Sequence, residues 1–160
     1  LAFTSPELVG RLPIFGTRSL AGVALPALTR APWLLSIYLH PGIVDMTQAR
    51  ELIRTVENPN RFVNRDIATW ICHGDPIIGG INIAEALPDV TLPLLTVIAN
   101  ADGIVPRATT IWPHEVIGSA RKDVLEVGSE EQPIAHADMF VSDLAPDLVF
   151  KPLGDWLDGP

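Results

Sequence analysis

The clearest alternation of apolar and polar segments lies in the second half of the chain. Leu94 to Ala99 is a continuous apolar run followed by Asn-Ala-Asp-Gly, which is typical of a strand buried on both faces of a parallel sheet. A helix of one to three turns is expected between Ala108 and Ile117, limited or kinked by Pro113. Asp123 to Val127 is expected to form a second strand.

A final helix is expected to begin near Pro146, because the missing N–H of proline costs nothing in a first helical turn. Its apolar residues share one face: Val149, Leu153, Trp156 and Leu157. The order strand, helix, strand, loop, helix predicts an α/β fold with a two-stranded parallel sheet. Since the edges of such a sheet are not stable alone, we expect the remaining strands in sequence outside this chain.

The first 88 residues have a different texture. Proline and glycine break short helical patterns there, no convincing alternating strand occurs, and a small helical layer is expected. The clearest predicted helices are Thr47 to Val56, with Asp45 as N-cap, and Asn60 to Ile71. One face of the second helix is apolar and must be covered: Val63, Ile67, Trp70 and Ile71. A turn-rich connector from Cys72 to Gly80 leads to a short helix around residues 82–87.

Composition narrows the classes of partner. The 160 residues carry a net charge of −8, which disfavours binding to nucleic acid or to anionic lipid. Although 48% of them are hydrophobic, no uninterrupted apolar stretch reaches the roughly 20 residues needed to cross a bilayer, so part of the apolar surface is expected to meet another protein segment. The chain begins at Leu1 without a signal peptide pattern, and we take it as a piece of a longer protein. The single cysteine leaves the compartment undetermined, with the cytoplasm as the default expectation.

Asp102 and His136 are the residues that point to chemistry. Asp102 follows the first predicted strand, and His136 lies in the loop after the second, 34 residues later. Because ligands bind at the carboxyl ends of parallel strands, the two side chains can meet there. A histidine that acts as general base needs a carboxylate on its other nitrogen. Taken singly, Asp-Gly is a common turn signal and a histidine is most often a surface residue; their joint placement favours function.

At these residues the sequence resembles the C-terminal half of an α/β-hydrolase, over roughly residues 90 to 158. Asn-Ala-Asp-Gly-Ile-Val-Pro at 100–106 resembles the acid loop of that family, and His-Ala-Asp-Met-Phe at 136–140 resembles its histidine loop. The segment 145–157 resembles the last helix of the family. The family order of nucleophile, acid and histidine implies Asp102 as triad acid and His136 as base.

The resemblance also implies that residues 1–88 form the cap or lid, and 89–160 the C-terminal part of the hydrolase core. Apolar residues of the cap either line an acyl pocket or, as is more usual, form the core of the cap: Leu12, Ile14, Phe15, Trp33, Leu34, Leu35 and Tyr38. The sequence departs from the family at Ala135, where glycine usually precedes the histidine.

The nucleophile of such a triad is missing. No Gly-x-Ser-x-Gly occurs in the chain, and no serine lies in the required strand, elbow and helix context: Ser5, Ser19, Ser36, Ser119, Ser129 and Ser142. Cys72 is interpreted as a buried or incidental thiol. Asp138 is a weaker competitor to Asp102 for orienting His136. His40, His73 and His114 lack a second ligand at metal spacing, so neither a metal nor a cofactor is expected.

The leading hypothesis is therefore part of a serine hydrolase that cleaves a carboxylic ester or thioester with an apolar acyl group. The expected partners are an N-terminal chain or segment carrying the nucleophile and a small acyl ester substrate. Two alternatives stay open. One is a non-catalytic, hydrolase-like fragment or subunit that serves assembly; the other is an acyltransferase or polyester synthase, some of which use cysteine as nucleophile.

Overall fold

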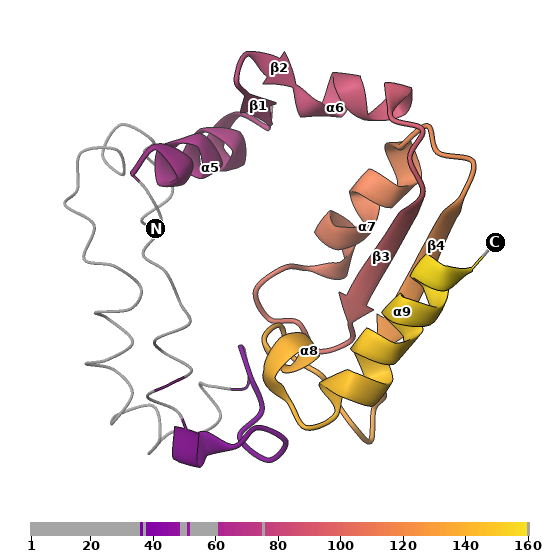
Figure 1. Ribbon diagram of the computed structural model, residues 1–160. Coiled ribbons are helices and arrows are strands. Elements are labelled where there is room, and N and C mark those ends of the chain that lie inside the picture. Colours follow the sequence, from indigo (N-terminus) through magenta and orange to yellow (C-terminus); the bar gives the residue numbers. More distant parts are fainter. Residues whose placement is uncertain (1–35, 37, 49–50, 52–60, 75, 160) are drawn as a thin grey trace.

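The computed structural model describes residues 36, 38–48, 51, 61–74 and 76–159, which form a mixed α/β structure with two small sheets (Figure 1). Its elements, in chain order, are the following: η2 (Met46–Gln48), α5 (Arg61–His73), β1 (Ile77–Ile78), β2 (Ile81–Asn82), α6 (Ile83–Ala86), η3 (Leu87–Asp89), β3 (Leu94–Ala99), α7 (Arg107–Val116), β4 (Lys122–Val127), α8 (Asp138–Val141), η4 (Pro146–Phe150) and α9 (Lys151–Asp158). Among these described helices, none is long and apolar enough to cross a membrane.

The parallel pair β3 and β4 is the centre of the C-terminal half. Its register runs from Leu94 opposite Lys122 to Ala99 opposite Val127, so both strands end at the same edge of the sheet. The prediction for β3 is confirmed, and β4 begins one residue earlier than expected. Helix α7 connects the strands and packs on β3, and Figure 1 shows α9 on the other side of the strand pair. This topology places the loops after β3 and β4 side by side.

The main core is formed next to the ends of β3 and β4, where these two loops begin. It consists of residues from both strand ends and from the segments that follow β4: Ala99, Val127, Ile134, Met139 and Val149. Ile134 is almost fully buried, and it precedes His136 by two residues. Burial of Ile134 in this core therefore holds the loop that carries His136 in place.

Helix α9 follows the prediction at its start and departs from it at its end. Pro146 stands in the first turn of η4, a π-helical turn that continues into α9. Val149 is buried, but Leu157 is 65% exposed, contrary to the predicted apolar face. In the described part of the chain the parallel sheet has two strands, β3 and β4, so no further described strand lies there for the last turn of α9 to cover.

The N-terminal region contains a feature that the sequence pattern missed. Residues 77–82 form an antiparallel hairpin, β1 with β2, where no strand was expected. The turn consists of Gly79 and Gly80, with φ values of 59° and 84°, which glycine adopts without strain. Each strand has two residues, too few for an alternating pattern to be recognised. The short helix expected at 82–87 is confirmed as α6 followed by η3.

Helix α5 agrees with the predicted helix in position but not in its buried face. The residue that it buries fully is Ala68, whereas its four predicted apolar residues are 39–61% exposed: Val63, Ile67, Trp70 and Ile71. This face is exposed in the described structure, so the expectation that it is covered stays a prediction about a further protein segment. The amphipathic pattern predicts the helix correctly because it reflects local periodicity, but it cannot name the neighbour that covers the apolar face.

Other predictions in the first half fall mostly on residues outside the described ranges. The helix Thr47 to Val56 is one of them; within the described part, the 3-10 turn η2 begins where the Asp45 carboxylate accepts a hydrogen bond from the Thr47 amide, 2.9 Å away. Asp45 thus caps the start of a helical turn, as expected. All of the proposed pocket residues except Tyr38 also lie outside the described ranges.

Candidate active site

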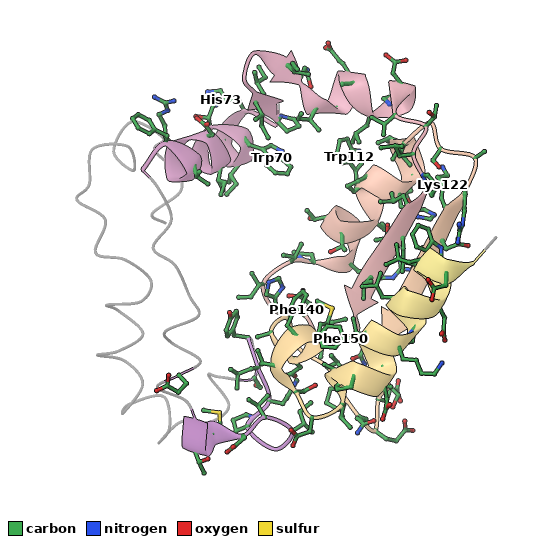
Figure 2. All side chains as sticks on the ribbon, viewed as in Figure 1. Trp70, His73, Trp112, Lys122, Phe140 and Phe150 are labelled. Carbon is green, nitrogen blue, oxygen red and sulfur yellow. The ribbon has the colours of Figure 1, made fainter. Side chains whose placement is uncertain are left out.

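Asp102 and His136 meet at the carboxyl ends of β3 and β4. The Nδ1 atom of His136 lies 2.8 Å from the Oδ2 atom of Asp102, a hydrogen bond between side chains 34 residues apart. The structure thus brings together the two residues that the sequence pattern singled out. In Figure 2, the labelled Phe140 of α8 marks the end of the strand pair at which the site lies.

The loop after β3 aims the Asp102 carboxylate. Its Oδ1 atom accepts hydrogen bonds from the backbone amides of Ile104 (2.8 Å) and Val105 (2.9 Å), which leaves Oδ2 for His136. An aspartate that accepts amides two and three residues ahead is a common way to close a turn. Asp102 therefore both closes the turn after β3 and bonds to His136, because the turn orients its carboxylate.

Asp102 carries a negative charge at neutral pH. Burial raises the pKa of this carboxyl group, but hydrogen bonds from the Val105 amide, the His136 ring and the Ile104 amide, together with the charge of His136, lower the pKa by more. An ionised carboxylate can only accept a hydrogen bond, so Nδ1 of His136 must donate. When the ring is neutral, the lone pair is then on Nε2, which can accept a proton.

Asn100 ties the acid loop to the histidine loop. Its side-chain Oδ1 accepts a hydrogen bond from the Ile134 amide (2.9 Å), and its Nδ2 donates to the Ser129 carbonyl (2.9 Å). The Ala101 amide adds a bond to the Ile134 carbonyl (3.0 Å). The sequence pattern predicted no role for Asn100 beyond its place in the motif 100–106. A signal was present, since an asparagine directly after a buried strand has polar groups that must be satisfied.

The position of the Asn100 side chain requires a glycine at residue 128. Its φ is +99°, and a Cβ atom added there would lie 2.1 Å from Oδ1 of Asn100. Only glycine allows both the backbone conformation and the close approach of the asparagine. The start of the histidine loop is therefore shaped by a residue without a side chain.

Asp138 does not orient His136, so the competing assignment is wrong. Its carboxylate is fully buried and bonds to His40 and Ala135. Oδ2 lies 2.6 Å from Nδ1 of His40, and Oδ1 accepts the backbone amide of His40 at 2.9 Å. Asp138 is the first residue of α8, and its side chain also accepts the amide of Ala135 three positions earlier, at 2.8 Å.

A segment from the predicted cap packs against the histidine loop. The Tyr38 carbonyl accepts the Ala137 amide (2.7 Å), and the centroids of the Tyr38 and His136 rings are 6.0 Å apart. Leu39 and Val44 form a small apolar cluster with Ala137. The side chain of His136 is one third exposed and that of Phe140 is well exposed, so the site is open to a further group.

Three of the serines in the described part of the chain bond to groups other than His136. The hydroxyls of Ser119, Ser129 and Ser142 hydrogen-bond to Arg121, Glu131 and Asp138. Ser5 and Ser19 lie outside the described residues. Cys72 is exposed on α5, so of the two interpretations, a buried or an incidental thiol, the buried one is wrong.

The other histidines have separate partners. Nδ1 of His73 lies 3.0 Å from the Thr69 carbonyl, and Nδ1 of His114 lies 3.5 Å from Oγ1 of Thr96. Within the described ranges, no three histidine, cysteine or carboxylate side chains gather as they would around a metal ion. These residues make ordinary structural contacts.

Comparison with known proteins identified no relative. The chain matches no family model, no curated protein and no solved structure. A functional conclusion for this chain must therefore be argued from the geometry of Asp102 and His136 and from the chemistry of the groups around them.

Proposed function

We propose that this chain supplies the acid and the base of a serine-hydrolase triad in an α/β-hydrolase fold. The observation that carries the proposal is the 2.8 Å contact between Oδ2 of Asp102 and Nδ1 of His136, at the ends of adjacent parallel strands. An ionised, partly buried aspartate that holds one nitrogen of an accessible histidine is the arrangement that a general base requires.

In the proposed reaction, Nε2 of His136 removes the proton from a serine hydroxyl as its oxygen attacks the carbonyl carbon of an ester or thioester. When the tetrahedral intermediate collapses, the imidazolium returns that proton to the departing alcohol or thiol. Water then repeats the two steps on the acyl-enzyme, which releases the carboxylic acid and restores the serine. Asp102 stabilises the imidazolium in both halves of the cycle.

The serine and the oxyanion-hole donors come, in this proposal, from a segment or a separate chain outside these 160 residues. The absence of Gly-x-Ser-x-Gly from the sequence supports this, and so does a parallel sheet of two strands, which needs further strands to be stable. Residues 1–88 then serve as the cap. The contact of Tyr38 with the histidine loop supports that assignment, and its partly exposed ring is consistent with an apolar acyl group.

The proposal is tested in the native protein that contains this chain, with p-nitrophenyl esters of increasing acyl length as substrates. We expect His136→Ala and Asp102→Asn to lower kcat/KM by about 10³–10⁴-fold, because the first variant lacks the base and the second favours the wrong tautomer. His73→Ala is the matched control, since that histidine is exposed on α5 and bonds to its own helix. Unchanged ester hydrolysis in both site variants would show that the pair is not catalytic.

A second function, assembly without catalysis, is favoured by the exposed apolar face of α5. Four large apolar side chains on one helix are unusual on a free surface and suit a contact with another protein segment. A preparation that forms a stable complex but never reacts with a fluorophosphonate favours this function. The same reactivity measurement with a thiol-directed probe distinguishes a serine hydrolase from an acyltransferase with a cysteine nucleophile.

A further inference from the structure

The backbone of His136 is held by a hydrogen bond on each side. The Ala135 amide donates to Oδ2 of Asp138 (2.8 Å), and the Ala137 amide donates to the carbonyl of Tyr38 (2.7 Å). One bond runs directly to the segment 38–44, and the other reaches it through Asp138. The direction of the His136 ring therefore depends on two contacts that lie outside the Asp102 loop.

Asp138 depends in turn on His40. Its carboxylate is completely buried, and His40 provides two of its three hydrogen bonds, from Nδ1 to Oδ2 (2.6 Å) and from the backbone amide to Oδ1 (2.9 Å). The Ala135 amide provides the third. A buried carboxylate that loses its donors is strongly disfavoured, so Asp138 keeps this conformation only while His40 is in place.

The segment that carries His40 is seated by further contacts. The Ile43 carbonyl accepts the Asp143 amide at 3.0 Å, just beyond α8. Leu39 and Val44 pack on Ala137, and Val141 of α8 packs against the same cluster. In Figure 1, the part of the chain around residues 38–48 lies next to α8. These contacts make docking of the segment and placement of the histidine loop a single event.

We propose that Asp138 and His40 are positioning residues for His136. They act through the backbone of the histidine loop, whereas Asp102 acts on the ring itself. The consequence is that His136 faces Asp102 only while the segment 38–44 is docked, which couples the predicted cap to the base of the site. The catalytic meaning of this coupling depends on the proposed function; the coupling itself does not.

The test is nuclear magnetic resonance of the native protein labelled with ¹⁵N-histidine. We expect the Nδ1 proton of His136, protected from exchange by its bond to Asp102, to give a distinct signal in the unsubstituted protein and in the control His73→Ala. His40→Ala should broaden this signal or remove it. His40→Asn should restore it at least partly, because the amide nitrogen of asparagine reaches about the position of imidazole Nδ1.

An unchanged His136 signal in a folded His40→Ala variant overturns the proposal. If that variant does not fold, hydrogen exchange in the unsubstituted protein decides the question. We expect the amides of Ala135 and Ala137 to exchange on the order of 100-fold more slowly than that of the exposed Glu130. Exchange as fast as that of Glu130 would mean that the two backbone bonds do not hold the loop.

These measurements use no substrate, so they separate the two proposals. Full ester hydrolysis by His136→Ala contradicts the proposed function. The nuclear magnetic resonance signals then still test whether His40 and Asp138 position His136. If both proposals hold, His40→Ala lowers kcat far more than it changes KM, and His40→Asn recovers part of the loss. A rise in KM at constant kcat would instead assign His40 to substrate binding and contradict its positioning role.

Discussion

A carboxylate bound to one nitrogen of an imidazole determines what the other nitrogen can do. Asp102 has this effect because the amides of Ile104 and Val105 hold its Oδ1 atom, which fixes Oδ2 toward His136. The sequence predicted the pair from residue type and from position after two strands. It could not predict that Asp138, two residues from His136, binds His40 instead, because that choice depends on a residue 98 positions away.

The lowered pKa of Asp102 predicts how stability depends on pH. Because its pKa in the folded protein lies below the ordinary value of 3.8, the ionised group stabilises the fold at higher pH. This contribution begins to fall as the pH drops to about 3.8 and is lost as the pH passes through the lower, folded pKa. We expect the difference in free energy of unfolding between the unsubstituted protein and Asp102→Asn to shrink over this range. Urea unfolding at several pH values measures it, and a constant difference would contradict the assignment.

At the scale of elements, Asn100 and Gly128 determine how the loop after β3 packs against the loop after β4. Asn100 extends from the end of β3 to the backbone of the histidine loop, and Gly128 leaves room for it at the end of β4. The strands and α7 were predictable because apolar periodicity over six to ten residues is a local property. The hairpin β1 and β2 was not, since four strand residues carry too little pattern.

Substitution of Gly128 tests this arrangement. We expect Gly128→Ala to destabilise the protein by about 1–3 kcal/mol, because the new Cβ meets both Asn100 and a backbone conformation unfavourable for alanine. Gly154→Ala is the control, because that glycine lies in α9 with open space around it. There the helix should gain up to about 1 kcal/mol. Thermal unfolding measures both variants, and equal effects at the two positions would show that the contact with Asn100 is unimportant.

At the scale of the whole molecule, the described structure has surfaces that suit contact with a further protein segment. The apolar face of α5 is exposed, and the parallel sheet has two strands. The apolar pattern of α5 predicted the helix but not its surroundings, because periodicity specifies which residues seek a neighbour without specifying the neighbour. The proposed segment with the nucleophile is a natural partner for the edges of such a sheet.

A fluorophosphonate label locates the nucleophile directly. We expect the native protein to react with the probe, and mass spectrometry of its peptides to place the label on a serine outside these 160 residues. His136→Ala should abolish the labelling, since the serine then has no base. A label on any serine of this chain would contradict the proposed division of the triad.

The sequence alone determined β3, β4, α7 and the candidates Asp102 and His136, since these follow from local periodicity and from the order of residue types along the chain. The tertiary structure decided which carboxylate faces which histidine: Asp102 faces His136, and Asp138 faces His40. Only the folded backbone brings residues 38–44 against residues 135–143. The reason is physical, because burial and hydrogen-bond geometry select partners by distance in space, and the sequence records only distance along the chain.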